Sequence, residues 1–330
     1  MRISGTIFGA AGIILALIFD PAYSATQVSH RHKHTHGAVA QVVTRSMGTP
    51  QSRVRTITRT VLSAKPQLSS ASVLVIDQLG GNTVYQKNPD SPMPIASITK
   101  LMTAMVVLDA NQPMTDMLTI SDADVDRLRN SSSRLMPGVT LSRRELLQLS
   151  LMSSENRATS ALSRYYPGGK QACVVAMNMK ARLLGMKRST FADPTGLDGN
   201  NTATAEDLAK MVRAANNYGL IKTITTTRSY IVDAAHRAPL QYRNTNALVK
   251  NSETNDWRIG LSKTGFINEA GHCLVMQAQI ANRPMIIVLL NAQGKYSGVG
   301  DANRIKHWLE RINYGRDTTP TSTLVRADAS

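Results

Sequence analysis

The pattern of apolar and polar positions predicts strands near both ends of the chain. Residues 72–77 are mostly apolar and rich in β-branched side chains, a Gly-Gly-Asn turn follows at Gly80, and residues 83–86 can return as a second strand. Three later segments are predicted to form a meander with a turn at Asn282 and Arg283: 259–266, 272–280 and 284–290. We therefore expect one antiparallel sheet assembled from both chain ends.

Between these strands the sequence predicts helices. Apolar residues occupy almost every face of residues 98–110, and prolines lie just upstream, so a buried helix is predicted to begin near Ser97. Further helices are predicted at 143–152, 156–165, 170–184, 205–217 and 301–312. This order indicates an α+β fold, in which the sheet is flanked by helices and carries an inserted helical lobe at about residues 110–250. A site is expected in the cleft between sheet and lobe.

The first residues predict export. Arg2 precedes an apolar run at 7–19, and the small residues Ala22 and Ser24 lie three and one positions before a cut after Ser24. The run is shorter than the roughly 20 residues that a spanning helix needs. We interpret residues 1–24 as a cleaved signal peptide and expect a periplasmic protein; a retained membrane anchor is the alternative.

Composition separates a basic arm from the rest of the chain. The chain has 330 residues, 42% of them apolar, which is enough to bury a core without disulfides. Its formal net charge is +16, and residues 25–70 contain seven basic residues and no acidic one. We interpret this arm as a disordered linker that favours peripheral association with the envelope. No aromatic residue is interleaved with its charges, so nucleic acid is not an expected partner. Residues 71–315 are predicted to form the folded domain, and 316–330 a flexible tail.

Histidines and cysteines leave two questions open. The arm contains four alternating histidines, His30, His32, His34 and His36. They could hold a transition metal, but no acid or cysteine completes a site, so a solvated linker is favoured. Export would permit a disulfide between Cys173 and Cys273, but two buried free thiols are favoured.

A serine and a lysine lie at the predicted start of the buried helix. Their three-residue spacing places Ser97 and Lys100 on one helix face. A lysine inside an apolar helix is desolvated, which favours its neutral form and lets it act as a base toward the serine. The backbone N–H groups of the helix start favour a developing oxyanion. Taken alone, this spacing is more often explained by a lysine that extends to solvent.

Two further motifs complete a set. Ser154-Glu155-Asn156 follows the helix at 143–152, and Lys263-Thr264-Gly265 lies in the first late strand. Singly, Ser154 could cap the next helix, and Lys263 could protect an edge strand from aggregation. Together, Ser-x-x-Lys, Ser-x-Asn and Lys-Thr-Gly each occur once, in the order used by penicillin-recognising serine acyl-transferases. The set predicts one site for acyl transfer through a serine.

These motifs and their surroundings resemble the serine D-Ala-D-Ala peptidases among the low-molecular-mass penicillin-binding proteins. The resemblance covers about residues 70–315 and includes the segments 96–102, 152–158, 193–197, 263–266 and 271–276. It implies the penicillin-binding transpeptidase fold and an acyl-enzyme mechanism that acts on peptidoglycan peptides, is blocked covalently by β-lactams and requires neither cofactor nor metal.

The resemblance also implies roles for individual residues. Three are catalytic: Ser97 as the nucleophile, Lys100 as its base and Ser154 as the relay of a proton to the leaving amine. The implied substrate-binding residues are Asn156, Lys263, Thr264, Gly265 and Phe266. Backbone N–H groups of Ser97 and Phe266 would form the oxyanion hole.

Within this family, D,D-endopeptidase action on cross-links is favoured over D-alanyl-D-alanine carboxypeptidase action. Glu155 stands where many carboxypeptidases have glycine, and the short, polar stretch that ends the chain leads us to expect neither the additional β-domain nor the amphipathic membrane helix of typical carboxypeptidases. A β-lactamase is a weaker alternative because no convincing Glu-x-x-Asn segment supplies a deacylating water. An inactive wall-peptide sensor is also weaker because the motif residues are intact.

Overall fold

The computed structural model describes residues 64–233, 239–312 and 314. The predicted signal peptide, the histidines of the basic arm and the predicted tail lie outside these residues. Within the described ranges, no helix is both long enough and apolar enough to cross a membrane. Regular structure begins with strand β1 (Ser70–Asp77) and ends with helix α8 (Ser297–Arg311).

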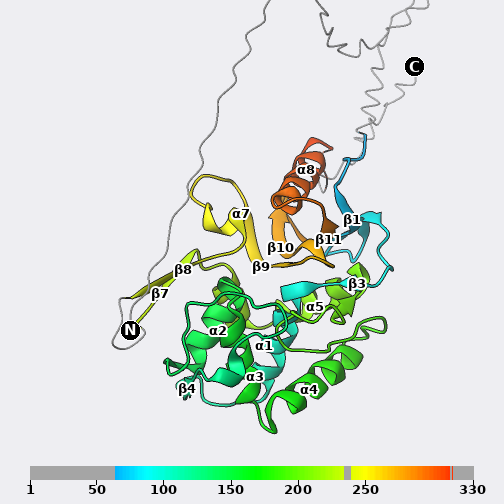
Figure 1. Ribbon diagram of the computed structural model, residues 1–330. Helices are drawn as coiled ribbons and strands as arrows, with labels where there is room; N and C mark the ends of the chain where they lie inside the picture. Colours follow the sequence, from blue (N-terminus) through cyan, green and yellow to red (C-terminus); the bar gives the residue numbers. More distant parts are fainter. Residues whose placement is uncertain (1–63, 234–238, 313, 315–330) are drawn as a thin grey trace, which may run out of the picture. The chain divides into compact units, whose positions relative to one another are not determined.

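The main sheet has five antiparallel strands in the order β2-β1-β11-β10-β9. The other four strands are β2 (Thr83–Lys87), β9 (Arg258–Ile267), β10 (Gly271–Ile280) and β11 (Arg283–Ala292). The first strand therefore lies beside the last, as Figure 1 shows, which confirms the sheet predicted from both chain ends. The turn between β10 and β11 is Ala281-Asn282, both at positive φ, because a two-residue hairpin turn of this kind matches the twist of the strands. The predicted turn was thus one residue too late.

Each face of this sheet is covered by helix. In β11, Met285, Ile287 and Leu289 share a hydrophobic cluster with residues of α8, whereas Ile286 and Val288 belong to a second cluster with α5 (Ala205–Ala215). Figure 1 shows α8 and α5 on opposite sides of the sheet. Burial of both faces explains why the late strands are almost continuously apolar instead of alternating.

The remaining helices form a lobe next to the sheet. They are α1 (Thr99–Asp109), α2 (Arg143–Met152), α3 (Asn156–Arg164), α4 (Gly169–Leu183) and α6 (Gly219–Thr225). The single turn α7 (Ala247–Lys250) is not part of the lobe, because its Leu248 belongs to the hydrophobic cluster that contains residues of α8. The helix α1 is buried along most of its length and contacts α2, α3, α4 and α5, so it is the centre of the lobe even though it precedes residue 110. Its burial on nearly all sides is what the sequence pattern predicted.

Three short strand pairs also occur where the sequence analysis placed helices or loops. They are β3 (Met93–Pro94) with β6 (Thr202–Ala203), β4 (Met117–Thr119) with β5 (Thr140–Ser142), and β7 (Ser229–Val232) with β8 (Leu240–Arg243). Segments of two to four residues are too short for a period-2 pattern to be visible in sequence.

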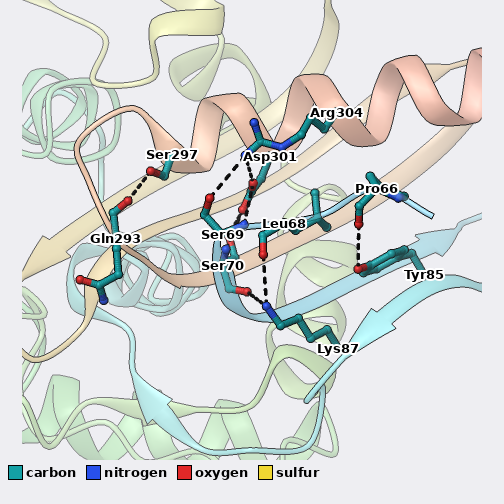
Figure 2. A network of polar contacts seen from close by, with 10 residues as sticks. All are labelled: Pro66, Leu68, Ser69, Ser70, Tyr85, Lys87, Gln293, Ser297, Asp301 and Arg304. Atoms are coloured by element: carbon teal, nitrogen blue, oxygen red, sulfur yellow. Dashed lines mark hydrogen bonds and ion pairs between the residues drawn. The ribbon is translucent and has the colours of Figure 1, made fainter. Parts of the chain in front are cut away.

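The start of β1 is fixed to α8 by a buried carboxylate (Figure 2). Asp301, which is fully buried, accepts hydrogen bonds from the backbone N–H groups of Ser69 (3.0 Å) and Ser70 (2.7 Å) and from the Ser70 hydroxyl (2.6 Å). Arg304 pairs with the same carboxylate, and Lys87 of β2 donates to the Ser70 carbonyl at 2.8 Å. These contacts join the start of β1 to both α8 and β2.

Candidate active site

Ser97 and Lys100 lie side by side at the start of α1. Ser97 belongs to the 3-10 turn η1 (Ala96–Ile98), and Lys100 to the first turn of the helix. The Lys100 Nζ donates to Ser97 Oγ at 2.8 Å, to Asn156 Oδ1 at 2.8 Å and to the Thr195 carbonyl at 2.6 Å. The lysine is fully buried, and this burial lowers its pKa to about 7. An amine with this pKa is partly neutral near pH 7 and can accept the proton of Ser97.

A glycine loop holds the turn that carries Ser97. Ala96 has φ 46°, in the left-handed region, and Gly196 lies directly against it. A Cβ on Gly196 would lie 2.0 Å from the Ala96 carbonyl oxygen, so only glycine permits this approach. Asp193 fixes the loop by accepting from the backbone N–H groups of Thr195 (2.9 Å) and Gly196 (3.0 Å). The loop thereby presents the Thr195 carbonyl to the lysine of the site.

The sequence analysis did not predict the contact between the Thr195 carbonyl and Lys100. The segment 193–197 was part of the family resemblance, but no role was assigned to it. Its Asp-Pro-Thr-Gly sequence is typical of a tight turn. A turn signal does not reveal which carbonyl faces a distant lysine.

Ser154 faces the sheet and does not cap α3. The N-cap of α3 is Glu155, whose side chain accepts from the N–H of Arg157 at 3.3 Å. Ser154 has φ 62°, and its hydroxyl accepts a hydrogen bond from Lys263 Nζ at 2.9 Å. The helix-cap interpretation of Ser154 is therefore wrong, and its hydroxyl belongs to the polar site.

Strand β9 brings the third motif against the serine turn. A Cβ on Gly265 would lie 2.9 Å from the carbonyl oxygen of Ile95 and 3.0 Å from the backbone nitrogen of Ser97, so glycine allows the strand to pass this close. Lys263 is 1% exposed, which rules out the role of an exposed edge lysine. Burial, together with the charge of Lys100, lowers the pKa of Lys263 well below its ordinary value.

The three motifs converge on one cavity of about 460 Å³. Six of the eight predicted site residues line it: Ser97, Ser154, Asn156, Thr264, Gly265 and Phe266. The other two, Lys100 and Lys263, are buried behind its wall and reach it through the hydroxyls that they contact. The predicted residues are thus brought together by a sheet strand and two segments of the lobe.

Both cysteines are free and buried, which confirms the favoured sequence interpretation. Cys273 of β10 is one of the cavity-lining residues, and its thiol donates to the Ala270 carbonyl at 3.4 Å. Burial raises the pKa of Cys273 to about 11 and that of Cys173 to about 12. Neither thiol is therefore a nucleophile near neutral pH.

Known proteins with similar sequences identify the family of this chain. A family model described as D-alanyl-D-alanine carboxypeptidase matches residues 59–294. The chain belongs to this family. Among curated members, the D-alanyl-D-alanine endopeptidase of Pseudomonas aeruginosa is 48% identical over 250 residues, covering 76% of this chain and 80% of the relative. The D-alanyl-D-alanine endopeptidase of Escherichia coli is 42% identical over 262 residues, covering 79% of this chain and 83% of the relative. The predicted family is confirmed.

Solved structures share the fold of this chain. The DD-transpeptidase of Streptomyces K15 superposes with a TM-score of 0.68 at 27% identity, covering 74% of this chain and 98% of that chain. This confirms the predicted α+β fold class. The protein is accordingly a serine-type hydrolase of this family.

Proposed function

We propose that the protein is a serine D,D-endopeptidase that hydrolyses D-Ala-containing cross-links of peptidoglycan. The observation that carries this proposal is the pair of contacts from Lys100 to Ser97 and from Lys263 to Ser154 across one cavity. They supply a base for the nucleophile and a separate proton path for the leaving group. The endopeptidase names of the two relatives above support cross-links over terminal D-alanine as substrate.

The geometry supports a two-step reaction. Ser97 Oγ attacks the D-Ala carbonyl carbon and gives its proton to Lys100 Nζ, while the N–H groups of Ser97 and Phe266 bind the oxyanion. The C–N bond then breaks, and the leaving amine takes the hydroxyl proton of Ser154, which is replaced from the Lys263 ammonium that donates a hydrogen bond to it. Water then attacks the ester and returns a proton along the Ser154–Lys263 path, while Lys100 gives its proton back to Ser97 Oγ as the carboxyl product leaves. Asn156 and Thr264 hold the substrate from opposite walls.

The proposal includes covalent inhibition and location. A β-lactam would acylate Ser97 in the same way, and the ester would persist where water cannot deacylate it. We also propose that a signal peptide exports the chain to the periplasm, where its basic arm associates with the envelope.

The reaction products distinguish an endopeptidase from a carboxypeptidase and from an inactive sensor. Wild-type protein and the Ser97→Ala variant are incubated with cross-linked muropeptide dimers and with monomeric pentapeptides, and the products are identified by mass. Conversion of dimers to monomers by the wild type alone is the expected result. Release of only a terminal alanine from pentapeptides indicates a carboxypeptidase instead. Stable penicillin acylation without any turnover indicates a sensor.

A further inference from the structure

The outer wall of the active-site cavity is cationic. Lys250 ends α7 and Lys295 precedes α8; both line the cavity that contains Ser97, as does the half-buried His272 of β10. Among the described residues that line this cavity, none is Asp or Glu. Both lysines are exposed, and within the described part of the chain neither ammonium group has a carboxylate partner. Two unpaired cations at the mouth of a catalytic cavity attract anionic groups.

Aromatic side chains accompany these cations. The ring of Phe266, which is 54% exposed, stacks on His272 with ring centroids 4.3 Å apart. Tyr296 is 68% exposed, and the Lys295 ammonium lies 5.7 Å from its ring centroid. Large exposed aromatic surfaces beside an active site provide contact area for a ligand longer than one amino acid.

A neighbouring cavity carries the opposite net charge. This second cavity of about 510 Å³ shares Asn156 with the first and is lined by five aspartates, Asp122, Asp124, Asp126, Asp193 and Asp198, against two basic residues, Arg127 and Lys170. Carboxylates of a substrate are therefore repelled from that side and drawn toward Lys250 and Lys295. Ser154, the proposed proton donor to the leaving amine, lines the cationic cavity, which places the leaving half of the substrate there.

We propose that Lys250 and Lys295 form a subsite for the leaving half of a cross-linked peptide and recognise its carboxylates. This proposal rests on the endopeptidase function argued above. A carboxypeptidase expels a single D-alanine, whose one carboxylate lies close to the departing amine. An endopeptidase expels a whole stem peptide that carries further carboxylates at a greater distance from the cut bond. The rim lysines are placed to meet these additional groups.

The test compares two substrates in matched variants. Lys250→Gln, Lys295→Gln and the double variant are measured on cross-linked dimers and on monomeric pentapeptides, at low and at high salt. Lys222→Gln is the control, because Lys222 is an exposed lysine on α6 that lies outside the cavity. Acylation by a fluorescent penicillin reports that Ser97 remains competent.

For each single variant we expect KM on the dimer to rise about threefold at low salt, and for the double variant about tenfold, with kcat little changed. The rise should shrink at high salt and be smaller on the pentapeptide. An unchanged KM on the dimer, or equal rises on both substrates, overturns the subsite.

A binding measurement tests the lysine subsite independently of the proposed endopeptidase activity. If the wild type leaves dimers uncut, the endopeptidase function fails, and calorimetric binding of dimers to Ser97→Ala protein then tests the subsite alone. Loss of affinity on adding both lysine substitutions supports it. Equal affinity with and without them overturns it.

Discussion

Two buried lysines lie at the centre of this site, and burial lowers the pKa of each. Lys100 is the clearer case, since it contacts Ser97, the proposed nucleophile, and burial lowers its pKa to about 7. Three nearby carboxylates raise this pKa, so the balance keeps it near neutrality instead of far below it. A base with a pKa near the working pH combines a useful neutral fraction with useful basicity.

This balance predicts how acylation depends on pH. Lys100 must be neutral to accept the proton of Ser97, so the second-order rate of acylation by a fluorescent penicillin should rise with pH through about 7 and then level off. Lys100→Arg, which keeps a permanent charge, should lower the rate about a thousandfold and remove the rise. A rate in the wild type that is flat or falls over this range would contradict Lys100 as the base. Thermal unfolding of the variant checks that it is folded.

At the scale of elements, buried Asp301 joins β1 to α8 through several hydrogen bonds. Burial alone would raise the pKa of Asp301, but the hydrogen bonds from Ser70 and Ser69 and the contact with Arg304 outweigh it and lower the pKa. The carboxylate therefore stabilises the folded state above the ordinary pKa of aspartate. This stabilisation is lost as the pH falls through the lower pKa of the folded state.

Asp301→Asn should accordingly lower the free energy of unfolding by about 2 kcal/mol at neutral pH, because an amide cannot accept all of these hydrogen bonds. The difference from wild type should narrow in acid, below about pH 4. Urea unfolding at several pH values measures both effects. Asp256→Asn is the matched control: Asp256 pairs with Lys306 at 2.6 Å but is 79% exposed, so its loss should change little. Equal losses in the two variants would show that burial of Asp301 contributes nothing.

The elements also show which features a sequence can predict. The five sheet strands and the long helices were predictable because each is a long apolar or periodic segment bounded by turn residues, and the site motifs because their residue types are rare in combination. The roles of Gly196 and Thr195 were not predictable, since they depend on a loop that approaches Ala96 from a distant part of the chain. The role of Ser154 was not predictable either. Its hydroxyl contacts Lys263, which is distant in sequence, and Glu155 is the N-cap of α3 instead.

At the scale of the whole molecule, the site joins two parts that the chain builds separately. Ser97 and Ser154 come from the lobe, whereas Lys263 and Phe266 come from the sheet, and one cavity lies between them. A group held covalently on Ser97 therefore contacts both parts. The ester stays on the chain when the protein unfolds, but its contacts with the cavity exist only in the folded protein, so these contacts favour the folded state.

Acylation should consequently stabilise the lobe and the sheet together. With a saturating penicillin we expect Tm to rise by several degrees in a single cooperative transition, since a gain of 1 kcal/mol shifts Tm by about 2–4 °C in a domain of this size. The Ser97→Ala variant should show no such rise, because it cannot form the ester. Differential scanning calorimetry measures the shift, and intact mass verifies the adduct in the same sample. Two results would contradict this prediction: a mass-verified adduct that leaves Tm unchanged, or a Tm increase in only one of two separate unfolding transitions. Either would mean that the acyl group does not contact both the lobe and the sheet and therefore does not lie in the cavity between them.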